Sequence, residues 1–201
     1  MRILLLTHAF NSLTQRLFVE LRDEGHEVSV EFDINDSVSR ETIDLYEPDL
    51  IVAPFVKRAI TEEIGRNHLC LIVHPGIKGD RGPSALDWAV LGGEDTRGVT
   101  VLQAIEEMDA GDIWASVNFP TRDAPKASLY RDEAASAAVK GVLLAIEKLQ
   151  EEGFTPEPLD YSNDDVKGQL RPLMKQADRA IDWQLDTTEH IIRKINSADG
   201  F

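Results

Sequence analysis

The sequence predicts an α/β protein with a doubly wound, mainly parallel sheet of the Rossmann type. Short, continuous apolar runs recur along the first half of the chain, as expected of parallel strands that helices cover on both faces. Segments with apolar residues at helical spacing separate these runs, and this alternation implies right-handed crossovers. The last two apolar runs are joined by a connection too short for a crossover, so they predict an antiparallel edge.

The first half of the chain alternates strand and helix. We predict strands at residues 3–6, 28–32, 50–53 and 69–73. The first helix begins at Asn11 and Ser12 and ends at Gly25, and a shorter helix spans residues 39–46. The pattern therefore places helices between parallel strands.

The second half of the domain supplies the predicted antiparallel edge. Pro83 begins a helix that ends near Leu91, before two glycines. Strands follow at residues 99–105 and 113–119, and apolar residues at helical spacing then predict a long helix that begins near Ala127. We expect this domain to span residues 1–152.

Residues 153–201 form a different kind of segment. Their composition turns polar and proline-containing, and the only further helix is expected from about Thr188 to Asn196. This extension is too small to fold alone. We expect it to act as a linker that docks on the domain or leads into a following region.

Composition narrows the classes of partner. The chain has 201 residues and 42% apolar composition, and its 21 basic against 36 acidic residues give a net charge of −15. No basic stretch is dense enough to follow a phosphate backbone, so we expect no nucleic-acid partner. The single cysteine, Cys70, and the absence of any apolar run of roughly 20 residues predict a cytoplasmic protein without a membrane partner, which we expect to be a monomer.

A histidine and a carboxylate follow predicted strands and are expected at the same end of the sheet. His74 precedes Pro75 and a glycine-rich loop, and Asp109 lies in the turn between the last two strands. Together they suit general acid/base chemistry. Alternatively, His74 is a structural histidine that bonds to a backbone carbonyl, and Asp109 caps its own turn. The turn-capping explanation also applies to Asp112, where it is stronger.

The sequence signals for other kinds of binding site are weaker. Asn11, Ser12 and Gln15 begin a helix whose exposed amides suit an anion, although ordinary helix capping is the commoner explanation. No glycine fingerprint for a dinucleotide follows the first strand. The five histidines show no paired ligand spacing, so we expect no metal site.

The ordered motifs resemble those of the folate-dependent formyltransferases, whose series is HP, RG, GVT and DxGDI. The matching residues here are His74-Pro75, Arg81-Gly82, Gly98-Val99-Thr100-Val101 and Asp109-Ala110-Gly111-Asp112-Ile113. The likeness covers residues 1–152, and Ile181-Asp182-Trp183 is similar to the linker of the tRNA-formylating branch.

This resemblance implies a doubly wound fold and 10-formyltetrahydrofolate as the formyl donor. It also implies catalytic roles for His74 and Asp109, and a pterin site formed by Arg58, Ile60, Met108 and Asp109. By the same likeness, Asn11, Ser12 and Gln15 match the place where acceptors bind in some relatives.

One position departs from the family pattern. The family's catalytic Asn lies two residues before the His, and Ile72 occupies that position here. An isoleucine cannot donate a hydrogen bond to a developing oxyanion, so another donor or an easier reaction is required. A thiol acceptor would make the reaction easier, because it ionises more readily than an alcohol.

The stretch as a whole resembles the hydrogenase-maturation branch of the family. That likeness implies formyl transfer to coenzyme A, followed by release of carbon monoxide for [NiFe]-hydrogenase from formyl-CoA by a crotonase-like domain absent from these residues. Two alternatives stay open. One is an amine acceptor, such as a nucleotide sugar or an aminoacyl-tRNA, although the charge of −15 disfavours tRNA. The other is a degenerate module that only binds folate or coenzyme A.

Overall fold

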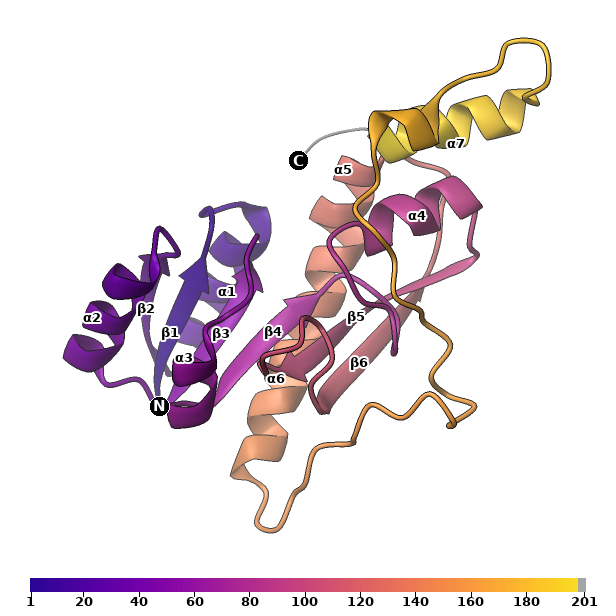
Figure 1. Ribbon diagram of the computed structural model, residues 1–201. Coiled ribbons are helices and arrows are strands. Elements are labelled where there is room, and N and C mark those ends of the chain that lie inside the picture. Colours follow the sequence, from indigo (N-terminus) through magenta and orange to yellow (C-terminus); the bar gives the residue numbers. More distant parts are fainter. Residues whose placement is uncertain (199–201) are drawn as a thin grey trace.

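The computed structural model describes residues 1–198, which form a six-stranded sheet between two layers of helices (Figure 1). The strand order is β2-β1-β3-β4-β5-β6. The strands are β1 (Arg2–Thr7), β2 (Glu27–Phe32), β3 (Leu50–Phe55), β4 (Cys70–His74), β5 (Thr96–Gln103) and β6 (Ile113–Pro120). The predicted fold class is confirmed.

The helices follow the strands in the predicted alternation. They are α1 (Ser12–Asp23), α2 (Asp36–Tyr46), α3 (Glu62–Asn67), α4 (Ala85–Gly92), α5 (Lys126–Leu129), α6 (Ala135–Gln150) and α7 (Thr188–Ala198), with a π-helical turn η1 (Tyr130–Ala134) and a 3₁₀ turn η2 (Gln176–Arg179). The π turn joins α5 to α6, so the long helix predicted from Ala127 is continuous but contains a bulge.

The sheet is parallel from β2 to β4 and antiparallel beyond. β1 pairs in parallel with β2 and β3, and β3 pairs in parallel with β4. β5 runs antiparallel to both β4 and β6, which confirms the predicted antiparallel edge. Because β5 is reversed, His74 at the end of β4 lies opposite Thr100 in the middle of β5.

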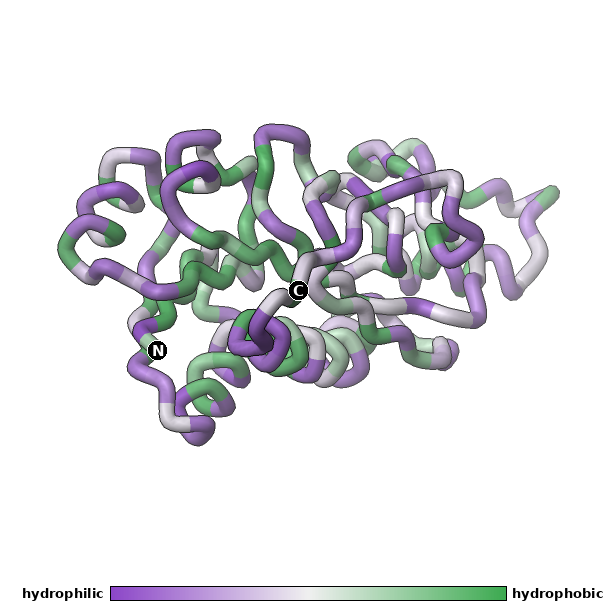
Figure 2. Tube along the Cα trace, turned by 90° about the horizontal axis from the view of Figure 1, so that it is seen from below, coloured by the Kyte–Doolittle hydropathy of each residue, from purple (hydrophilic) through white to green (hydrophobic). Residues whose placement is uncertain are grey.

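Alternating side chains divide the core into two layers. On one face, Leu5, Val52 and Leu71 pack beneath α1 and α6, and on the other face Leu4, Ile51 and Ile72 pack with residues of α2 and α3. Figure 2 shows this distribution, with hydrophobic residues along the central strands and hydrophilic residues concentrated on the outer helices and loops. Helices on both faces leave the strand ends as the place for a site.

The extension after α6 runs along the β6 side of the sheet and reaches α4, where α7 packs (Figure 1). Residues 166–174, which we call the strap, lie against the loop that follows β4. Gly168 N donates to Lys78 O at 2.9 Å, Arg81 N donates to Gln169 O at 3.1 Å, and Arg171 N donates to Arg81 O at 2.9 Å. The docking expected for this segment is therefore observed.

Within residues 1–198, no helix combines the length and the apolar character needed to cross a bilayer.

Replacement of Gly168 by alanine should destabilise the docked strap. A Cβ at this position would overlap the backbone of Gly79 and Asp80, so one of the two segments must move. We expect Gly168→Ala to lower the free energy of unfolding by about 1–3 kcal/mol in urea titrations. Gly92→Ala is the control, because its Cβ would meet only ordinary contacts and alanine favours the helix by about 0.5–1 kcal/mol. Equal stability of the two variants would contradict the close approach.

Candidate active site

The end of β4 places His74 at the carboxyl edge of the parallel strands. Pro75 follows directly and cannot donate to a strand ladder, so the chain leaves the sheet there. A residue of β5 fixes the loop that follows, because Thr100 Oγ1 donates to Gly76 O at 2.9 Å. His74 itself is only 5% exposed. The imidazole is therefore fixed at the base of a loop rather than free in solvent.

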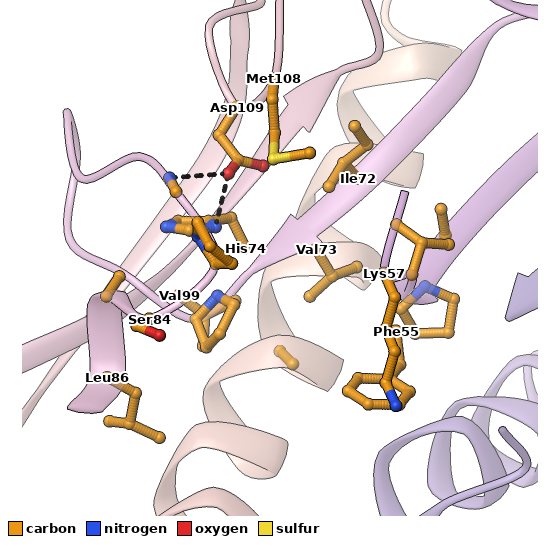
Figure 3. Close-up of a pocket in the computed structure, with 18 of the residues that line it drawn as sticks. Phe55, Lys57, Ile72, Val73, His74, Ser84, Leu86, Val99, Met108 and Asp109 are labelled. Carbon is orange, nitrogen blue, oxygen red and sulfur yellow. Dashed lines mark hydrogen bonds and ion pairs between the residues drawn. The ribbon is translucent and has the colours of Figure 1, made fainter. Parts of the chain in front are cut away.

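Asp109 approaches this histidine from the loop between β5 and β6. Its backbone has a φ of 53°, a left-handed conformation that few residues other than glycine adopt. Its side chain is buried, and Oδ2 accepts a hydrogen bond of 3.0 Å from Gly82 N. The same oxygen lies 3.4 Å from His74 Nδ1 (Figure 3). The structure thus brings together the two residues to which the sequence assigned acid/base chemistry.

The surroundings of His74 favour a neutral ring. Burial is the largest effect and lowers the pKa of His74 below its ordinary value of 6.5, while the carboxylates of Asp109 and Asp80 oppose that shift. A carboxylate beside Nδ1 favours the tautomer that carries its proton there, which leaves a lone pair on Nε2. Among residues 1–198, Nε2 has no hydrogen-bond partner. The ring thus keeps a buried acceptor nitrogen that no group of the described residues occupies.

The pair opens into a cavity of about 590 Å³. Figure 3 shows His74 and Asp109 on one side and Phe55 and Lys57, from the end of β3 and the loop after it, across the cavity. Most of the wall between them is apolar and includes Val73, Leu86 and Val99. A concave, mostly apolar space with a few convergent polar groups is typical of a small-molecule site.

Three residues that the resemblance assigned to the pterin site also line this cavity, namely Arg58, Ile60 and Met108. The guanidinium of Arg58 is committed elsewhere, since its Nε donates to Asp33 Oδ1 at 2.9 Å and it also pairs with Asp36. The hydrogen bond to Asp33 is the largest cause of the raised pKa of Arg58. The side chain of Ile60 packs into the core beside α3. At Ile60, the loop after β3 can therefore offer a ligand only backbone N–H and C=O groups.

The three residues assigned to an acceptor are not in the lining. Asn11 caps α1, because its Oδ1 accepts from Thr14 N at 3.1 Å, and Gln15 Nε2 donates to Phe10 O at 2.7 Å. Ser12 begins α1. Asn11 Nδ2 also donates to Tyr130 OH at 3.2 Å, and Tyr130 lines the cavity. Asn11 therefore stands one contact away from the cavity, and it has the capping geometry considered as its alternative.

Sequence reasoning missed a buried ion pair in the wall. Lys126 Nζ donates to Asp87 Oδ1 at 2.8 Å, and both residues line the cavity. Two buried charges carry a desolvation cost that apolar residues would avoid. The only signal in the sequence was a lysine at the start of a predicted helix, a position at which a charge is usually solvated.

The position of the family's catalytic amide is apolar here. Ile72 is 9% exposed, and alternation along β4 places it on the same face as His74. It lines the cavity and contributes no hydrogen-bond donor there. Within the part of the chain that the structure describes, no group of three or more His, Cys, Asp or Glu side chains is placed to hold a metal ion.

Comparisons with known proteins agree with this geometry. Residues 31–146 match the family model for formyl transferase. The chain is 56% identical to the hydrogenase maturation factor HoxX of Bradyrhizobium diazoefficiens over 200 residues, which cover 100% of this chain and 35% of the relative. It is 31% identical to the methionyl-tRNA formyltransferase of Desulfotalea psychrophila over 157 residues, which cover 74% and 46% of the two chains.

A solved structure matches over nearly the whole chain. The crystal structure of HypX from Aquifex aeolicus in complex with tetrahydrofolic acid superposes with a TM-score of 0.92 at 47% identity, covering 99% of this chain and 34% of that chain. The chain described here therefore spans about a third of the length of HoxX and HypX.

The buried imidazole should make stability depend on pH. The pKa of His74 is below 6.5 in the folded chain, so the unfolded chain binds the proton more readily as pH falls below that value. The free energy of unfolding should therefore decrease as the pH falls below about 6.5. In urea titrations at a series of pH values, His74→Phe should reduce this slope relative to the unaltered protein. An unchanged slope in His74→Phe would contradict the prediction.

Proposed function

The chain belongs to the formyl transferase family, and on that premise we propose that it transfers a formyl group from 10-formyltetrahydrofolate to the thiol of coenzyme A. The observation that carries the proposal is the buried His74–Asp109 pair facing an apolar cavity of about 590 Å³ beside Ile72. The pair supplies proton transfer, and the apolar neighbour favours an acceptor that needs little help from an oxyanion donor.

The cavity suits a reduced pterin. Its apolar wall can cover the faces of a ring system, while backbone groups near Arg58 and Met108 and the carboxylate of Asp109 offer partners for ring nitrogens and the exocyclic amine. HypX of Aquifex aeolicus, which is 47% identical, has been crystallised in complex with tetrahydrofolic acid. This likeness supports folate as the donor for the present chain.

His74 is the proton carrier in the proposed reaction. Its neutral ring takes the proton from the thiol as the sulfur bonds to the formyl carbon. The bond between that carbon and N10 of the folate breaks, and His74 returns the proton to N10, so no net proton is consumed. Asp109 stabilises the intermediate imidazolium and fixes the orientation of the ring.

The departure at Ile72 is consistent with a thiol acceptor. Loss of one oxyanion donor typically costs 10²- to 10³-fold in rate, which a demanding acceptor could not tolerate. A thiol has a pKa near 8.5 and forms a strongly nucleophilic thiolate, so its attack needs less stabilisation from the protein. The missing amide is therefore compatible with turnover.

The longer relatives support a proposal for the role of the product. HoxX is a hydrogenase maturation factor, and the present chain matches only 35% of its length. We propose that the formyl-CoA supplies carbon monoxide for [NiFe]-hydrogenase maturation, and that a crotonase-like domain of the same polypeptide releases it. The partners of this chain are then small-molecule substrates and that second domain.

Removal of the imidazole should abolish most transfer. We expect His74→Ala to reduce kcat for formyl-CoA formation by about 10²- to 10⁴-fold, because general acid/base catalysis is lost. The assay follows formyl-CoA by chromatography with 10-formyltetrahydrofolate and coenzyme A as substrates. His68→Ala, which alters a histidine after α3 outside the cavity lining, is the control. Undiminished turnover of His74→Ala would remove the histidine from the mechanism.

A second candidate function is folate or coenzyme A binding without turnover, and Ile72 is the observation that favours it. In that case calorimetry should detect tetrahydrofolate binding, while neither coenzyme A nor a panel of amine acceptors should be formylated. Formyl-CoA production would exclude this candidate, and formylation of an amine alone would replace the thiol by an amine as the acceptor.

Restoring an amide at position 72 should shift the preference between acceptors. We expect Ile72→Asn to raise amine formylation about tenfold relative to thiol formylation, because an amine acceptor depends more on an oxyanion donor. The buried amide should also lower the free energy of unfolding by about 1–3 kcal/mol. Ile72→Leu preserves the apolar surface and serves as the matched control. The same ratio of amine to thiol transfer in both variants would contradict this account of Ile72.

A further inference from the structure

The strap binds the loop that carries the catalytic pair. The loop of residues 75–83 leaves β4 after His74, and its Gly82 amide donates to Asp109 Oδ2. The strap pairs with that loop on both sides of Leu170, where Arg81 donates to Gln169 and accepts from Arg171. The strap, more than 80 positions later in the sequence, thus bonds to Arg81, the residue next to the Gly82 amide that donates to Asp109.

We propose that Arg171 and Asp80 are positioning residues for His74 and Asp109, so that the strap completes the active site from outside the motif-bearing domain. This inference deepens the proposed formyl transfer and rests on it. It assigns a role to two residues that stand outside the recognised motifs.

Asp80 connects the strap to the imidazole. It is only 4% exposed, and its Oδ1 accepts from Gln169 N at 3.0 Å and lies 3.4 Å from Arg171 Nε. A Cβ on Gly76 would stand 2.7 Å from both Asp80 Cβ and His74 Nε2. The Asp80 side chain and the proton-accepting nitrogen are therefore separated by little more than a glycine.

Arg171 fixes the strap at two points. Besides Asp80, its Nη2 lies 2.5 Å from Glu94 Oε1, just after the end of α4. Its carbonyl oxygen packs so closely on Gly82 that any Cβ there would overlap it. Gly82 also has a φ of 99°, which favours glycine. The main chain of Arg171 thus holds the peptide whose N–H orients Asp109, while its guanidinium holds Asp80 and Glu94.

The charges around His74 come from three elements. Asp109 faces it from the loop between β5 and β6, Asp80 from its own loop, and Arg171 from the strap beyond Asp80. Other charged side chains in the cavity lining are Lys57, Arg58, Asp87 and Lys126. Asp80 supports the protonated form of His74, as does Asp109. Its removal should therefore favour the neutral ring.

The test uses a readout that does not depend on the acceptor. Histidine NMR titration of the whole polypeptide should show that Asp80→Asn lowers the pKa of His74 relative to the unaltered protein. Lys167→Ala is the control, because it removes an exposed positive charge from the same strap. Thermal melting establishes that each variant is folded.

Kinetics test the geometric part of the proposal. Arg171→Ala should lower kcat for formyl transfer by about tenfold or more, since small displacements of catalytic groups are costly. Arg171→Lys keeps the charge and should recover part of that loss. In the His74→Ala background, Arg171→Ala should have little further effect, because a positioning residue acts only through the group that it positions. A residue that merely stabilised the fold would lower activity in both backgrounds.

The possible outcomes distinguish failure of the positioning role from failure of the proposed formyl transfer. An unchanged His74 titration in Asp80→Asn, or equal kcat in Arg171→Ala and Lys167→Ala, would overturn the positioning role even if formyl transfer is confirmed. If Asp80→Asn does not fold, the Arg171→Ala and Arg171→Lys comparison decides. If no acceptor is formylated, the NMR titration still decides whether Asp80 acts on His74, while the proposed function alone fails.

Discussion

One carboxylate oxygen, Asp109 Oδ2, joins the two loops that form the candidate active site. It accepts the Gly82 amide at 3.0 Å and stands 3.4 Å from His74 Nδ1, so it joins the loop after β4 to the loop between β5 and β6. β5 is antiparallel to β4, with Gln103 opposite Leu71, so the β5–β6 connection begins beside the amino end of β4 and Asp109 reaches back from there to His74. The left-handed backbone of Asp109 is the local strain that aims the side chain there.

Burial determines the protonation state of His74. Desolvation is the largest effect on His74 and keeps its ring neutral, while the nearby carboxylates of Asp109 and Asp80 limit how far the pKa falls. A base needs both influences, since an imidazole that is too acidic binds no proton and one that is too basic carries it already. The same enclosure is consistent with the pairing of the buried charges Lys126 and Asp87 in the wall.

The sequence predicted the sheet because strands buried on both faces leave continuous apolar runs. The rule that residues following such runs meet at the strand ends does not account for the approach of Asp109 to His74, because β5 is antiparallel to β4 and its last residue, Gln103, lies opposite Leu71 near the start of β4. Asp80 and Arg171 could not be predicted as partners, because they are 91 positions apart and the strap between α6 and α7 has no periodic pattern. The sequence also identified Arg58 by position, but not that Asp33 and Asp36 occupy its guanidinium.

Ile72 links the proposed acceptor to the electrostatics of the site. It lies on the same face of β4 as His74 and presents hydrocarbon to the cavity, so it helps to exclude water from the region around the ring. An amide at that position would stabilise an oxyanion but would also bring a polar group towards the imidazole. An amine attacks as the neutral –NH2 and loses a proton only after the N–C bond has formed, so stabilisation of the oxyanion matters more for it. For a thiol, early proton removal by a neutral base matters more, and the apolar neighbour serves that requirement.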